Sequence, residues 1–139
     1  MELQHTIEIA APPEVVWKVL IDVERWPEWT ASTTKVERVD KLAFGLGSQV
    51  RIEQPKLAKT VWTVTRFEPA KSFDWDSRTT GSHTIAGHII EPSGTGSKVT
   101  LTVQVSGWAA RLLQGFIKPL TERYMATEAQ GLKKRCERQ

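Results

Sequence analysis

Residues 108–139 read WAARLLQGFIKPLTERYMATEAQGLKKRCERQ, and their apolar positions have the spacing of a helix that packs on one side. The predicted packed face carries Ala109, Leu113, Phe116, Ile117, Leu120 and Tyr124. After Pro119 the apolar stripe rotates by roughly a third of a turn, given the ~100° per residue of an α-helix. It then runs through Met125, Ala129, Leu132 and Cys136. The rotation leaves Tyr124, Thr127 and Gly131 facing a space that no large apolar side chain fills, so we predict that this helix covers a cavity.

The chain before this helix is predicted to form an antiparallel sheet. Residues 2–9 alternate between apolar and polar side chains, which is typical of a half-buried strand. Six more segments are rich in β-branched and aromatic residues and are separated by glycine or proline turns: 35–40, 49–53, 61–67, 72–78, 83–91 and 98–105. Short connections make neighbouring strands antiparallel, so we predict seven strands in meander order, curved around the C-terminal helix, in the α+β class.

Two short helices are predicted between the first two strands. Pro12 and Pro13 followed by Glu14 are typical of a helix start, because proline is tolerated in the first turn and an acid there favours the helix dipole. The helix is predicted over residues 15–23. Pro27 restricts the chain that follows, so residues 24–29 are predicted to form a second short helix or a turn.

Length and composition indicate one ordinary domain, residues 1–139. The single cysteine, Cys136, cannot form an intramolecular disulfide, and no signal peptide or membrane span is recognisable, so we expect a cytoplasmic protein. The net charge of +3 is small. The basic cluster at residues 133–138 is explained by a solvated helix end, so no nucleic-acid partner is predicted; the alternative explanation is contact with an acidic partner or nucleic acid. The oligomeric state is expected to be a monomer or a homodimer.

Three local motifs carry a resemblance to a known family. They are AAPPEVVW at residues 10–17, followed by Asp22 and by WPEW at 26–29; FEP at 67–69; and EPSGTGSKVT at 91–100. With the predicted order of elements, the whole chain resembles the helix-grip fold of the START and Bet v 1-like (SRPBCC) superfamily, in particular its bacterial polyketide cyclase/dehydrase and lipid-transport-like branch. The resemblance implies a deep apolar cavity between the sheet and the C-terminal helix, with a hydrophobic small molecule as its ligand.

The candidate site residues lie on that implied cavity. The resemblance places His88 and Ile90 on the cavity side, and His5 shares that side through its own strand. His5, His88 and Tyr124 are weak catalytic candidates; the alternative is that a neighbouring backbone group satisfies each of them. Trp62 and Trp75 are either pocket walls or outer-face packing. The predicted ligand-binding set is His5, Trp62, Trp75, His88, Leu113, Phe116, Leu120 and Tyr124.

Motifs of other chemistries are missing from the sequence. It contains no P-loop, no dinucleotide-binding glycine motif, no zinc-protease motif and no nucleophile elbow. Neither a metal nor a cofactor is predicted: His83 and His88 are five residues apart on a strand and face opposite sides. Asp74 and Asp76 share a face opposite Phe73 and Trp75, and we interpret them as a solvent-facing pair.

Three functions remain open on this basis. The first is a carrier that binds a lipid, an isoprenoid or a polyketide in the cavity. The second is a polyketide cyclase or dehydrase acting in the same cavity by orienting its substrate and transferring protons. The third is a protein-interaction module, which predicts an exposed apolar patch outside the cavity.

Overall fold

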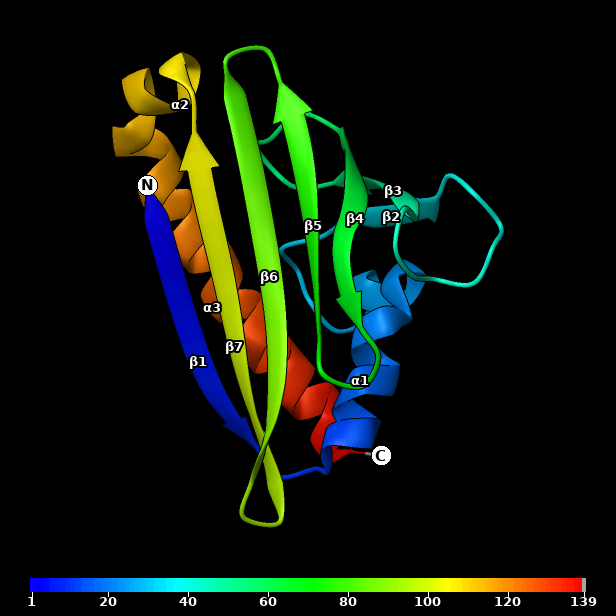
Figure 1. Ribbon diagram of the computed structural model, residues 1–139. Helices are drawn as coiled ribbons and strands as arrows, with labels where there is room; N and C mark the ends of the chain where they lie inside the picture. Colours follow the sequence, from blue (N-terminus) through cyan, green and yellow to red (C-terminus); the bar gives the residue numbers. More distant parts are fainter. Residues whose placement is uncertain (139) are drawn as a thin grey trace.

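A computed structural model describes residues 1–138 as a curved antiparallel sheet with helices against its concave side (Figure 1). Its elements are β1 Glu2–Ile9, α1 Pro13–Ile21, the 3₁₀ helix η1 Val23–Glu28, β2 Lys35–Arg38, β3 Gln49–Glu53, β4 Thr60–Glu68, β5 Ser72–Thr79, β6 Ser82–Ser93, β7 Gly96–Ser106, α2 Trp108–Leu112 and α3 Gln114–Glu137. The predicted helix-grip architecture, with seven strands and a long C-terminal helix, is confirmed.

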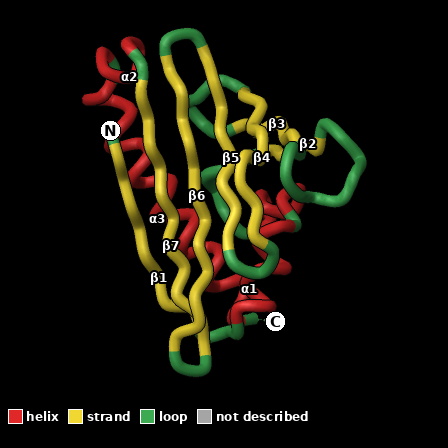
Figure 2. The backbone as a smooth tube through the Cα atoms, in the orientation of Figure 1, coloured by secondary structure: helices red, strands yellow, loops and turns green. Residues whose placement is uncertain are grey.

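The strand order corrects one part of the prediction. The sheet runs β1-β7-β6-β5-β4-β3-β2, so six strands follow the predicted meander while β1 pairs with β7 instead of β2 (Figure 2). In this pairing His5 lies opposite Leu101. The physical reason is that α1 and η1 carry the chain across the sheet, so that β2 starts at the far edge.

Two short helices lie between β1 and β2 as predicted, but α1 starts and ends two residues earlier than the predicted range 15–23, and η1 is Val23–Glu28 instead of residues 24–29. Proline occupies the first turn of α1 and Glu14 adds a negative charge there, which favours the positive end of the helix dipole. Pro27 lies inside η1, which is a short 3₁₀ helix. The buried Trp26 indole N–H donates to the Leu20 carbonyl at 3.0 Å, and this bond fixes η1 against α1.

The C-terminal segment forms two helices, which changes the predicted packing of its first half. The chain breaks at Leu113, so a single helical wheel no longer describes both parts. The second predicted stripe is confirmed, because Met125, Ala129, Leu132 and Cys136 are all buried. In the first stripe Leu120 is buried, whereas Leu113 and Phe116 are largely exposed near the α2–α3 junction.

Gly131 does not face an empty space as predicted. A Cβ atom at this position would lie 1.9 Å from the Trp29 carbonyl oxygen, so α3 touches the backbone just after η1. Only glycine permits this approach. The helix is therefore closely packed at its C-terminal end, and the space it leaves lies nearer to α2.

The hydrophobic core occupies the end of the molecule near α1. There the inner face of the sheet, α1 and the second half of α3 bury fully enclosed side chains such as Val16, Leu20, Phe73, Val99 and Leu132. The other end of the sheet, towards α2, extends beyond this core. None of the helices in the described residues is long and apolar enough to cross a bilayer.

Candidate functional site

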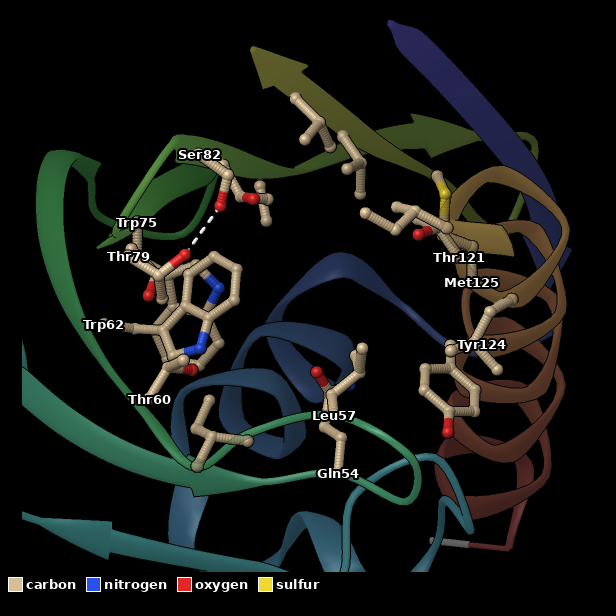
Figure 3. A pocket seen from close by; sticks show the side chains of 18 of the residues that line it. Gln54, Leu57, Thr60, Trp62, Trp75, Thr79, Ser82, Thr121, Tyr124 and Met125 are labelled. Atoms are coloured by element: carbon tan, nitrogen blue, oxygen red, sulfur yellow. Dashed lines mark hydrogen bonds between the residues drawn. The ribbon is translucent and has the colours of Figure 1, made fainter. Parts of the chain in front are cut away.

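A cavity of about 420 Å³ lies between the concave face of the sheet and helices α2 and α3 (Figure 3). Among its lining residues, those that are most exposed are Leu57, Ala58, Thr79, Thr80 and Leu113. The mouth therefore lies between the β3–β4 loop, the β5–β6 turn and the α2–α3 junction. The predicted void beneath the C-terminal helix exists.

The inner wall of the cavity is aromatic. Trp75 is buried at its centre, with ring centroids 5.3 Å from Trp26 and 5.9 Å from Trp62. His88 joins the cluster with its ring 5.6 Å from that of Trp75 and stacked on Phe73 at 4.2 Å. Offset and edge contacts of this kind stabilise aromatic clusters beyond their burial.

Two titratable groups from different elements meet at the inner end of the cavity. His88 of β6 and Glu128 of α3 both line it, and the His88 Nε2 and Glu128 Oε2 atoms are 3.9 Å apart. The His88 Nδ1 atom lies 3.1 Å from the Phe73 carbonyl oxygen, which can only accept, so Nδ1 carries the proton and donates. In the neutral ring Nε2 is then a free acceptor that faces the Glu128 carboxyl group.

Burial determines the charge state of both groups. Desolvation lowers the pKa of His88 from 6.5 to about 4, opposed by the hydrogen bond to the Phe73 carbonyl. Desolvation also raises the pKa of Glu128 from 4.5 to about 8. At neutral pH the cavity therefore contains a neutral imidazole that can accept a proton and a neutral carboxyl group that can donate one.

Two polar atoms of the wall have no protein partner. Within residues 1–138 the structure provides no hydrogen bond for Trp62 Nε1 or Ser77 Oγ, although both atoms are buried. Both residues line the cavity. A buried donor without a partner costs free energy, which a bound water or ligand atom recovers.

Tyr124 connects α3 to the loop on the other side of the cavity. Its hydroxyl group donates a hydrogen bond to the Pro55 carbonyl, and the ring lies on the cavity lining (Figure 3). The loop it reaches also contributes Gln54 and Leu57 to the lining. Tyr124 thus ties the loop at residues 54–59 to the helix beside the mouth.

The structure brings together six of the eight residues predicted to bind a ligand. Those that line the cavity are Trp62, Trp75, His88, Leu113, Leu120 and Tyr124. His5 and Phe116 do not line it: His5 lies on the edge strand β1, which α3 covers directly, and Phe116 is exposed beside the mouth. Asp74 and Asp76 do not line the cavity, but they are half-buried instead of fully solvent-facing, and Asp76 pairs with His83 at 2.8 Å.

Glu128 is the residue that the sequence analysis missed. It shares a helical line with Ile117, Thr121 and Tyr124, which are all lining residues at the i, i+4, i+7, i+11 spacing. Continuing this helical line of residues beyond Pro119 would have identified Glu128 from the sequence. As for metal ions, no three His, Cys, Asp or Glu side chains among residues 1–138 gather closely enough to hold one.

Comparison with known proteins agrees with this geometry. The family model described as polyketide cyclase / dehydrase and lipid transport matches residues 1–137. The chain is also similar in structure to the Zhui aromatase/cyclase from Streptomyces sp. R1128, with 22% identity, a TM-score of 0.83, and 99% of this chain and 94% of that chain covered.

Two further solved structures share the fold at low sequence identity. A protein from Thermus thermophilus has 20% identity and a TM-score of 0.80, with 98% of this chain and 97% of that chain covered. A START superfamily protein from Mycobacterium smegmatis has 16% identity and a TM-score of 0.78, with 99% and 97% covered. No match was found among curated proteins.

Proposed function

The chain belongs to the polyketide cyclase / dehydrase and lipid transport family, and we propose that it binds a hydrophobic small molecule between its sheet and α3. The observation that carries this proposal is the aromatic-walled cavity of about 420 Å³. Its volume lies within the roughly 300–1,000 Å³ of pockets that bind small molecules. A cytoplasmic location and a monomeric or homodimeric state are part of the proposal.

The lining supports a ligand that is largely apolar and uncharged. No lysine or arginine is among the described lining residues, so a buried anionic group would have no cation to balance it. The unpaired Trp62 N–H and the neutral Glu128 carboxyl group are both donors. A lipid, isoprenoid or polyketide with at least one carbonyl or hydroxyl oxygen satisfies both conditions.

A side chain that fills the cavity tests the proposal. Thr84 points into the cavity from β6, so Thr84→Trp should weaken binding of the neutral fluorescent probe N-phenyl-1-naphthylamine by about tenfold or more, since an indole replaces the bound ring. Thr65→Trp on the exposed side of β4 is the matched control and should bind the probe normally. Native mass spectrometry of the purified protein should also reveal a co-purifying apolar compound. Equal binding by both variants would contradict the proposal.

A second candidate function, polyketide cyclisation, is favoured by the pair formed by His88 and Glu128. With a poly-β-ketone in the cavity, His88 Nε2 accepts a proton from the carbon between two carbonyl groups while Glu128 protonates one carbonyl oxygen, which gives an enol. The enol carbon then attacks a second carbonyl, and a carbon–carbon bond forms. The proton on His88 goes to the new alkoxide, and the enol oxygen returns its proton to Glu128.

Substitutions of this pair separate the carrier from the enzyme. Glu128→Gln and His88→Phe keep a side chain of similar size at each position. The first removes the proton donor and the second removes the proton acceptor. A carrier should retain probe affinity within about threefold, because most of the buried apolar contact remains. A cyclase should keep binding and lose about a hundredfold or more in turnover of a synthetic poly-β-ketone. Tyr124→Phe belongs in the same series, since its hydroxyl group contacts the loop at the mouth.

A further inference from the structure

An exposed apolar cluster surrounds the cavity mouth on the side of α2. Trp108, Leu112 and Phe116 are 65%, 77% and 54% exposed, and none of them lines the cavity. Leu113, which does line it, is exposed in the same segment, and Leu57, a second exposed lining residue, lies on the β3–β4 loop. Large apolar side chains gathered at one exposed place are unusual on a soluble surface and mark an interaction site.

The charged residues within the three segments around the mouth are basic, and two acids, Glu53 and Glu122, directly adjoin these segments. We define the entrance rim as residues 54–60, 78–82 and 107–121, the three segments that contain the most exposed lining residues, Leu57, Ala58, Thr79, Thr80 and Leu113. The rim carries Lys56, Lys59, Arg78, Arg111 and Lys118, all exposed, and no aspartate or glutamate. The whole chain has 19 Lys and Arg against 16 Asp and Glu, so the remainder of the chain is slightly negative.

These cations are not used in the packing of the fold. Of these five cations, only Lys59 has a carboxylate within ion-pair distance among the described residues, with its Nζ atom 3.9 Å from Glu53 Oε1. In Figure 1 the β5–β6 turn and α2 lie at the same end of the molecule, and the end near α1 is opposite. The positive charge of the rim is therefore directed to one end, around one opening.

We propose that the entrance rim docks on the surface of an anionic lipid bilayer. Tryptophan and phenylalanine side chains favour the boundary between headgroups and acyl chains, and lysine and arginine bind the anionic headgroups around them. The rim supplies both groups of side chains on one surface. A second copy of this chain fits less well, because a rim-to-rim contact would bring two sets of five cations together with only the adjoining Glu53 and Glu122 to balance them.

Docking of this kind places the cavity mouth against the bilayer. An apolar ligand then moves between membrane and cavity without crossing water, a consequence that rests on the proposed binding function. The docking surface itself does not depend on that function, because Trp108, Phe116, Arg111 and Lys118 lie outside the cavity lining.

Vesicle flotation tests the proposal with the intact chain. We expect the protein to float with vesicles of phosphatidylcholine containing about 30% phosphatidylglycerol, to float poorly with phosphatidylcholine alone, and to dissociate as salt is raised. The double variant Arg111→Gln, Lys118→Gln should bind about 30-fold less tightly, because each cation at an anionic surface contributes about fivefold. The double variant Trp108→Ala, Phe116→Ala should lose most of its binding.

Matched controls lie elsewhere on the surface. Leu42→Ala with Leu46→Ala removes two equally exposed apolar side chains from the β2–β3 loop, and Lys71→Gln with Lys98→Gln removes two exposed cations near the opposite end. Both controls should float like the unmodified protein. N-phenyl-1-naphthylamine binding, measured on every variant, reports the cavity separately.

Four results would overturn the proposal: no flotation with anionic vesicles, equal flotation with neutral vesicles, rim variants that float as well as the controls, or an acidic protein partner that binds the rim while vesicles do not. Unchanged probe binding alongside any of these would leave the cavity function standing. Lost probe binding with intact flotation would instead contradict the proposed function alone.

Discussion

Replacing Glu128 should change how the free energy of unfolding depends on pH. The pKa of Glu128 is raised from 4.5 to about 8 by burial, so between these values the unfolded state releases a proton that the folded state retains. The free energy of unfolding then falls by about 1.4 kcal/mol per pH unit as pH rises. For His88, whose pKa is lowered from 6.5 to about 4, the unfolded state holds the extra proton and the free energy of unfolding rises with pH by the same amount.

The two effects overlap and cancel over part of the range. Between about pH 4.5 and 6.5 the opposing slopes should leave the free energy of unfolding of the unmodified protein nearly constant. Above pH 6.5 only the Glu128 effect remains, and it should lower the free energy of unfolding by about 2 kcal/mol by pH 8. Glu128→Gln removes the decrease in the free energy of unfolding that Glu128 causes. The free energy of unfolding of this variant should therefore rise up to pH 6.5 and then stay level. Its gain over the unmodified protein should reach about 3 kcal/mol at pH 7.

Urea unfolding followed by circular dichroism at pH 5, 6, 7 and 8 measures these differences. The control Glu122→Gln removes an exposed carboxylate from the same helix without touching the cavity. A third variant, His88→Gln, should show the opposite profile, a fall that begins near pH 4.5. If Glu128→Gln and the unmodified protein change in parallel from pH 5 to 8, Glu128 is not a buried neutral acid and the proton-transfer pair is refuted.

Three further substitutions probe the packing of α3 and the loop at the mouth. Gly131→Ala should lower the free energy of unfolding by at least about 2 kcal/mol, because the new methyl group meets the Trp29 carbonyl. Gly115→Ala should raise it by up to about 1 kcal/mol, because a methyl group at Gly115 has no other atom within 4 Å. Equal urea midpoints for these two variants would disprove the close contact after η1. Tyr124→Phe removes the hydrogen bond to the Pro55 carbonyl and should speed probe dissociation about fivefold in stopped-flow measurements, and an unchanged rate would show that the loop is not held by this bond.

The fold could be predicted from the sequence because most of its information is local. Alternation at residues 2–9 gave the first strand with the observed bounds, and turn residues separated the other six. The partner of β1 could not be predicted, because it depends on how far α1 and η1 carry the chain. Which side chains of the strand at residues 61–67 point inward could not be predicted either. The strand is apolar on both sides and contains a bulge between Val64 and Arg66 that changes its register.

The site was predicted where a residue's environment follows from its own strand or helix face. His88 and Leu120 are examples, and both line the cavity. Glu128 was missed because a glutamate on a helix is normally solvated, and its burial depends on elements far away in the chain, such as β6 with His88. His5 was misplaced for the same kind of reason: its strand faces the correct side, but α3 lies too close to leave a space there.

The position of the cavity follows from the sizes of the inward-facing side chains along β6. Its inward positions change from Ser82 and Thr84 near the mouth, through Ala86, to His88 and Ile90 near the core. Small side chains leave the space empty, and the two hydroxyl groups can hydrogen-bond water when no ligand is present, which lowers the cost of keeping the cavity open. If the proposed apolar ligand binds, it would displace such water and contact the aromatic wall. The large residues near α1 therefore fill the core, and the small ones near α2 leave the cavity open.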